Sequence, residues 1–146
     1  MKRICRLVAS ALVILPLAAG SAAAQEKSLY QRLGGYDAIA AIMDDFGGRL
    51  ATQEQFKRFF VGHSKDSELR QRQLVIDLFC QLTGGPCTYI GRDLKVAHAG
   101  LGITKADWDA ATKMFGETLA KFKIDEREQQ ELGALIAPRE KDIVEK

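Results

Sequence analysis

Little in this sequence favours a sheet, a membrane span or a familiar enzyme fingerprint. Runs of alternating β-branched residues are missing, and beyond the first 24 residues proline occurs only at Pro86 and Pro138, both at segment boundaries. There is no glycine-rich flavin or nicotinamide fingerprint, and no spacing supports a serine–histidine–acid or paired-carboxylate site. These absences give no support to a hydrolase or dehydrogenase, and they leave a helical domain as the prediction.

The first 24 residues have the three-part pattern of a secretory signal peptide. A basic start precedes an apolar run from Leu7 to Ala19, and Ala22 to Ala24 supply the small residues that a signal peptidase reads. The apolar run is shorter than the roughly 20 residues that span a bilayer. We therefore expect cleavage after Ala24, no stable membrane insertion, and a periplasmic or secreted domain over 25–146.

The charge balance gives no support to nucleic-acid binding. The signal segment carries Lys2, Arg3 and Arg6 and no acidic residue, so its removal takes the formal net charge from +2 to −1. The remaining lysines and arginines are scattered among aspartates and glutamates, which is typical of a solvated surface.

Two cysteines, Cys80 and Cys87, follow the signal segment, with Gly84-Gly85-Pro86 between them. An oxidising compartment favours a disulfide, and this turn sequence would bring the two residues together. Two buried free thiols fit the sequence equally well. A zinc site that adds His63 and His98 is a third reading, although these spacings match no familiar zinc pattern.

Helical periodicity extends through the whole of 25–146. We expect helices over 28–33, 36–50, 55–60, 68–82, a short one holding His98, 104–122 and 125–137. Ser67 is expected to cap the helix over 68–82, Thr104 and Asp107 to form a capping box, and Asp125 and Glu128 to form another capping pair.

Two of the expected helices have residues that either helix packing or a ligand would explain. Gly47-Gly48 falls inside the helix over 36–50, where each glycine costs about 1 kcal/mol relative to alanine, so a close neighbour or a ligand is the usual reason. One face of the helix over 68–82 is expected to be formed by Gln71, Val75, Leu78, Phe79 and Leu82.

Ala97-His98-Ala99-Gly100-Leu101-Gly102-Ile103 is the most informative stretch, because His98 lies among small and apolar residues. A neutral imidazole in such a setting suits an iron ligand. Glycines after it let the backbone and a flat cofactor approach each other closely. The other histidine, His63, lies in a polar segment that favours solvent exposure.

The order of these motifs resembles a truncated haemoglobin of the first group, over about Ser28 to Val144. The matching segments are Leu29–Gly35, Asp44–Phe46, Phe59-Phe60, Gly84–Pro86, Ala97–Thr104 and Leu132–Pro138. The resemblance implies an all-α, two-over-two helical sandwich around haem. One departure is Gly47, which stands where the family often has a tyrosine whose hydroxyl bonds the gas.

The resemblance also implies the site residues. His98 corresponds to the proximal iron ligand, and Gln71 falls on the distal wall, where it or Gln73 could donate a hydrogen bond to the gas. The apolar slot would be lined by Phe46, Phe60, Val75, Leu78, Phe79 and Leu94. Tyr89, Arg92 and Lys95 lie beside the proximal segment and are placed to reach the haem propionates.

The implied function is reversible binding of oxygen, nitric oxide or carbon monoxide on non-covalent haem b, since no Cys-x-x-Cys-His motif is present. Nitric oxide detoxification is the enzymatic variant, and it would need an external electron-donor protein. A haem-free helical module that binds a partner protein is the alternative, and in that case Gly47-Gly48 would serve helix packing alone.

Overall fold

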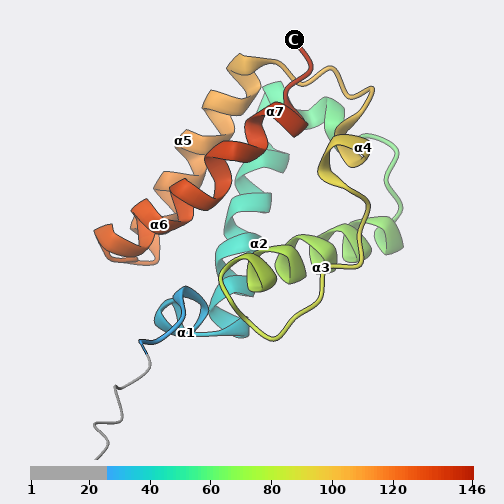
Figure 1. Cartoon of the computed structure of the whole chain (residues 1–146). Coiled ribbons are helices and arrows are strands. Elements are labelled where there is room, and N and C mark those ends of the chain that lie inside the picture. The colour runs from blue at the N-terminus through green and yellow to red at the C-terminus, as the bar shows by residue number, and fades with distance from the viewer. Residues whose placement is uncertain (1–25) are drawn as a thin grey trace, which may run out of the picture.

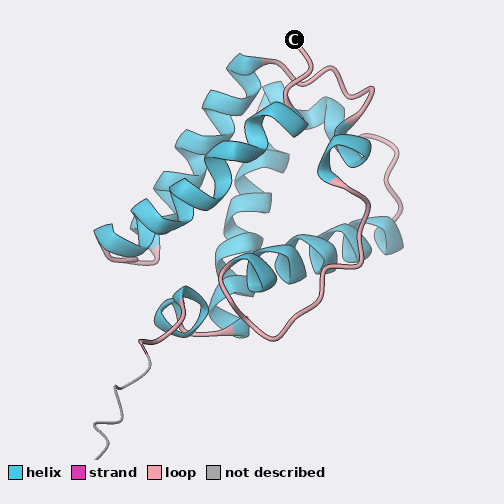
Figure 2. Ribbon diagram, viewed as in Figure 1, coloured by secondary structure: helices cyan, strands magenta, loops and turns pink. Residues whose placement is uncertain are grey.

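In the computed structural model, residues 26–146 form an all-helical fold, so the expected signal peptide lies outside the described residues. The elements in this part of the chain are α1 (Leu29–Leu33), α2 (Tyr36–Thr52), η1 (Glu54–Phe59), α3 (Lys65–Leu82), α4 (Leu94–His98), α5 (Lys105–Lys121), α6 (Glu126–Ile136), η2 (Ala137–Arg139) and α7 (Glu140–Ile143) (Figure 1). No strand occurs between residues 26 and 146 (Figure 2), as the periodicity predicts.

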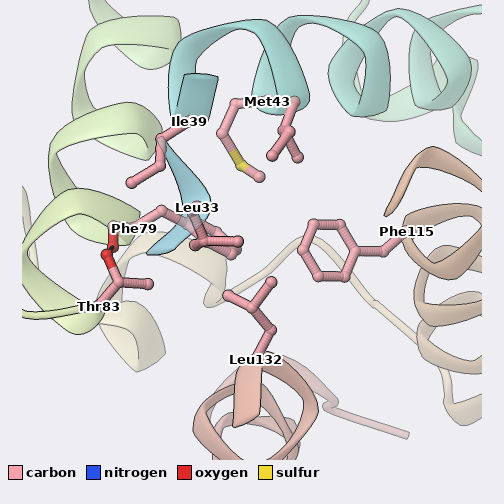
Figure 3. A pocket seen from close by; sticks show the side chains of 8 residues that line it. Leu33, Ile39, Met43, Phe79, Thr83, Phe115 and Leu132 are labelled. Atoms are coloured by element: carbon pink, nitrogen blue, oxygen red, sulfur yellow. Dashed lines mark hydrogen bonds between the residues drawn. The ribbon is translucent and has the colours of Figure 1, made fainter. Parts of the chain in front are cut away.

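Helix α2 is the centre of the packing and contacts both α3 and α5. Its inward residues Ile39, Ile42 and Met43 meet Phe115 of α5 and Leu132 of α6 around a small apolar cavity (Figure 3). Burying side chains of this size stabilises the fold by roughly 1.5–3 kcal/mol each. The helix predicted over 36–50 is confirmed.

The fully buried stripe of α3 differs from the predicted one. Ile76 and Cys80 have no exposed surface, whereas Val75, Leu78, Phe79 and Leu82 are half-buried and Gln71 is exposed. The predicted face is thus rotated about the helix axis relative to the α2 contact. Both sets of residues have helical spacing, so periodicity alone does not predict which set is buried.

The start of α3 also differs from the prediction. Ser64 is the N-cap, and its Oγ accepts a hydrogen bond from the Ser67 N–H at 3.2 Å. The helix therefore begins at Lys65, and the prediction that Ser67 caps it was wrong. Both serines have capping chemistry, and the geometry of the preceding turn selects the earlier one.

The two capping pairs predicted near the C-terminal half had opposite outcomes. Thr104 and Asp107 form the expected capping box of α5. Asp125 is the N-cap of α6 but makes no side-chain capping bond, and Glu128 instead accepts from Arg32 of α1 at 2.8 Å. The predicted pairing of Asp125 with Glu128 was wrong, because a guanidinium from another helix takes the Glu128 carboxylate.

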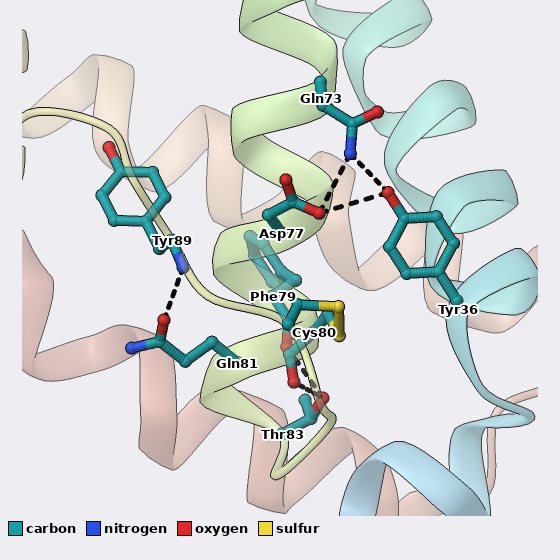
Figure 4. Close-up of a disulfide and its surroundings, with 9 residues drawn as sticks. Tyr36, Gln73, Asp77, Phe79, Cys80, Gln81, Thr83 and Tyr89 are labelled. Carbon is teal, nitrogen blue, oxygen red and sulfur yellow. Dashed lines mark hydrogen bonds between the residues drawn. A yellow bond between two sulfur atoms is a disulfide. The ribbon is translucent and has the colours of Figure 1, made fainter.

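Cys80 and Cys87 form a disulfide, with their Cα atoms 5.8 Å apart (Figure 4). The bond ties the end of α3 to the loop that leads to α4. Because the two cysteines are bonded to each other, they are not free thiols, and neither sulfur is available to the zinc site considered from the sequence. No group of three or more potential metal-ligating side chains gathers elsewhere in residues 26–146. In the same range, no helix has the length and apolarity to cross a membrane.

Candidate functional site

His98 ends the short helix α4, which begins at the N-cap Asp93. The imidazole is half-buried, and its Nδ1 lies 2.7 Å from the carbonyl oxygen of Leu94, one turn earlier. A carbonyl can only accept, so Nδ1 carries the proton and donates it. The lone pair is therefore on Nε2, the nitrogen that remains available to a metal ion.

Two aromatic side chains of the predicted slot pack on a third, Phe115, which was not among the predicted site residues. Phe46 of α2 and Phe79 of α3 both pack on Phe115 of α5, with ring centroids 5.2 and 5.7 Å away. Phe115 itself is buried. The contact of Phe115 with both rings depends on how α2, α3 and α5 pack together, so only the tertiary structure shows it.

Phe60 directly follows η1, a short 3₁₀ helix of six residues that is tied to α5. Phe56 of η1 is buried, and Phe60, directly after η1, is half-buried. Gln55 and Arg58 both bond the carboxylate of Asp107 at 2.7 Å, so η1 is tied to the start of α5. These contacts fix the place of Phe60 although it belongs to a short irregular stretch.

The segment before His98 contains the three polar residues predicted to reach the propionates, and Tyr89 contacts the main chain of Arg92. The Tyr89 hydroxyl donates to the carbonyl oxygen of Arg92 at 2.7 Å. The Tyr89 N–H donates to Gln81 Oε1 at 2.6 Å (Figure 4). The side chains of Arg92 and Lys95 are exposed. Neither has an ion pair within residues 26–146, so both cations face solvent beside α4.

Two glutamines of α3 have different surroundings. Gln73 donates to the Tyr36 hydroxyl at 2.5 Å and to Asp77 Oδ1 at 3.0 Å (Figure 4). Gln71 is exposed, and its side chain forms no hydrogen bond with the described part of the chain. The Gln71 amide therefore has no hydrogen-bond partner among the described residues, whereas the Gln73 amide is bonded to Tyr36 of α2 and to Asp77.

Gly47 and Gly48 are not explained by helix packing. A Cβ atom built at either position would meet no atom within 4 Å among the side chains and backbone around it. Gly47 is half-buried and follows Met43 by one turn on the inward side of α2. The close approach of a neighbouring helix is therefore not what requires these glycines.

An all-helical domain with a half-buried histidine that offers Nε2 is typical of the globin class of haem proteins. The chain belongs to the bacterial-like globin family, whose sequence model matches residues 28–145. The resemblance that the sequence motifs indicated is thus confirmed.

The similar proteins are truncated haemoglobins. A group 1 truncated haemoglobin of Mycolicibacterium paratuberculosis is 28% identical over 120 residues, which are 82% of this chain and 86% of that protein. One of Tetrahymena pyriformis is 27% identical over 120 residues, 82% of this chain and 97% of the relative. The crystal structure of truncated haemoglobin from Tetrahymena pyriformis in its ferric form superposes with a TM-score of 0.73 at 27% identity, covering 82% of this chain and all of that one.

The predicted two-over-two globin fold is confirmed by these superpositions. A second structural neighbour, the 2/2 haemoglobin of a Synechococcus species, has a TM-score of 0.73 at 25% identity, with 81% of this chain and 98% of that one covered, and carries covalently attached haem. Membership in the family makes this chain a haem-based gas-binding globin. The donor set fits the group, because the Nδ1–H bond to the Leu94 carbonyl leaves His98 Nε2 unprotonated.

Proposed function

We propose that this globin holds haem b non-covalently through His98 Nε2 and reversibly binds a diatomic gas, with oxygen as the main ligand. The observation that carries the proposal is the Nδ1–H bond from His98 to the Leu94 carbonyl at 2.7 Å. Such a bond fixes the tautomer and the ring orientation of a metal-ligating histidine and raises its basicity. When bound, haem supplies the iron that coordinates the gas.

The apolar residues of the site would exclude water from both faces of the group. Phe46, Phe60, Val75, Leu78 and Phe79 are half-buried rather than sealed in the core, so their side chains keep surface for a flat ligand. Leu94 and Leu101 would do the same beside His98. Arg92 and Lys95, with Tyr89 holding their loop, would pair with the propionates.

On the gas-binding side, the chain's own residues offer one amide donor. The exposed, unengaged Gln71 would swing over the ligand, whereas Gly47 supplies no hydroxyl. We therefore propose a distal side of low polarity. Nitric oxide detoxification is the second function on the same site, and it would require an external electron-donor protein.

The disulfide supports an oxidising location for the domain. Cys80 and Cys87 are joined, and such bonds persist in the periplasm or outside the cell. Together with the signal pattern of residues 1–24, this supports a periplasmic or secreted protein. The same bond engages both cysteines, which supports non-covalent rather than thioether-linked haem.

Visible absorption spectra of the 25–146 chain, loaded with haem, reduced and then exposed to carbon monoxide, test this proposal. A sharp Soret band that shifts with carbon monoxide is the expected result. His98→Ala is expected to lose or alter the band, and His63→Ala is the matched control, because His63 is exposed on the turn before α3. A folded chain that refuses haem would favour the haem-free partner-binding module.

A further inference from the structure

The C-terminal residues return to the turn that follows His98. Beyond α7 the chain runs beside the loop between α4 and α5 (Figure 1). There the Glu145 carboxylate accepts the Gly100 N–H at 2.6 Å and the Gly102 N–H at 2.5 Å. Both glycines have positive φ, +84° and +64°, so their amides point into a concavity that suits an anion.

Main-chain bonds reinforce this contact. The Glu145 N–H donates to the Ile103 carbonyl at 2.8 Å, and the Lys105 N–H donates to the Lys146 carbonyl at 3.1 Å. Ile103 is buried. The last residues thus bind the whole stretch from Gly100 to Lys105, across a sequence separation of 45 residues between Gly100 and Glu145.

Helix α4 is too short to be stable by itself. It is five residues long, and an isolated helix of that length is unstable in water. The turn after it is coupled to His98 directly, since the Leu101 N–H donates to the His98 carbonyl at 3.2 Å. Restraint of Gly100 and Gly102 therefore restrains the residue that carries the imidazole.

We propose that Glu145 is a positioning residue for His98, which acts by clamping the Gly100–Gly102 turn and so fixing the axial nitrogen relative to haem. This inference rests on the proposed axial role of His98. The two N–H donors also lower the pKa of the Glu145 carboxyl, which keeps it ionised at neutral pH. Loss of the clamp would let α4 tilt and would weaken the bond between the imidazole and the iron.

The test compares the 25–146 chain with Glu145→Ala, Glu145→Gln and the control Glu126→Ala. Glu126 is a matched surface glutamate, because its carboxylate accepts only from Gln130 of its own helix. Three quantities are measured: amide hydrogen exchange over residues 99–103 in the haem-free chain, haem transfer to excess apomyoglobin, and the iron–histidine stretching frequency of the reduced protein.

Glu145→Ala is expected to raise the amide exchange rate, to lose haem roughly fivefold faster, and to shift the stretching frequency, because two bonds to a charged acceptor are removed. Glu145→Gln keeps an acceptor oxygen and should fall between Glu145→Ala and the wild type. Glu126→Ala should match the wild type in all three measurements.

Unchanged haem loss and an unchanged stretching frequency in Glu145→Ala would overturn the inference, even if the amides exchanged faster, because the contact would then be structural only. That result differs from failure of the proposed function. If the wild-type chain bound no haem, or if His98→Ala kept a normal iron–histidine frequency, the axial assignment itself would be wrong, and the positioning role with it.

Discussion

Arg58 Nη2 donates to Asp107 Oδ2 at 2.7 Å and thereby joins η1 to the first turn of α5. The Asp107 carboxylate is buried and also accepts from Gln55, from the Thr104 N–H and from the Thr104 hydroxyl. One carboxylate thus serves the capping box of α5 and the anchor of η1. Through η1, it fixes the aromatic pair Phe59-Phe60 at the edge of the site.

Asp107→Ala is expected to lower the free energy of unfolding by about 1–3 kcal/mol, because it removes a cap and leaves buried donors unpaired. Arg58→Ala should cost no more than about 1 kcal/mol, since the guanidinium is half-exposed and solvent replaces its partner. Urea unfolding followed by circular dichroism measures both. Equal effects of the two substitutions would contradict this ranking.

Acid should destabilise the fold through two carboxylates. Hydrogen bonds from Arg49, Lys121 and Thr118 outweigh burial and lower the pKa of Asp45. At Asp107 burial raises the pKa, but the bonds from Thr104, Gln55 and Arg58 outweigh it and the net pKa is lowered.

Both folded pKa values lie below the unfolded value of about 3.9, so this stabilisation is complete above that pH and is lost as pH falls below it. The urea midpoint is therefore expected to be flat between about pH 7 and 5 and to drop below about pH 4. The doubly substituted Asp45→Asn, Asp107→Asn protein should show a weaker drop. A midpoint that rose with acid would refute the assignment.

Reduction of the Cys80–Cys87 bond is expected to lower the free energy of unfolding by roughly 2–3 kcal/mol, the loop-entropy value for a short closed loop. Unfolding with and without a reductant measures it. A Cys80→Ala, Cys87→Ala protein should be insensitive to the reductant. Equal stability of the oxidised and reduced wild type would show that the crosslink contributes nothing.

Gln71→Leu is expected to accelerate oxygen dissociation by about 10- to 100-fold, which corresponds to the roughly 1.5–3 kcal/mol of a hydrogen bond to a partly charged group. Gln73→Leu is the matched control, because its amide is engaged with Tyr36 and Asp77. Stopped-flow displacement by carbon monoxide gives both rates. An unchanged rate in Gln71→Leu would remove Gln71 from the distal site.

Local chemistry accounts for most of what the sequence predicts correctly. The helix over 36–50 extends to Thr52 in the structure, and the expected end at Leu82 is kept, with Gly84 at positive φ just beyond. The capping box of Thr104 and Asp107 involves neighbours three residues apart, and such contacts follow from sequence alone. A short helix holding His98 was also predicted, and in the structure α4 ends at that residue.

Contacts between distant segments were not predictable in this way. Glu128 meets Arg32 rather than Asp125, and Phe115 receives both Phe46 and Phe79. Each choice depends on which helices lie side by side. Helix α3 has two adjacent apolar stripes, and packing against α2 buries the one that contains Ile76 and Cys80.

The sequence by itself determined the helical class and the order of the globin motifs, because periodicity, capping and motif order are local properties. Only the tertiary structure decided that Cys80 pairs with Cys87, that Ser64 begins α3, and that Glu145 clamps Gly100 and Gly102. These outcomes depend on how the chain folds back on itself, since alternatives with the same local chemistry are separated only by which groups the packing brings within bonding distance.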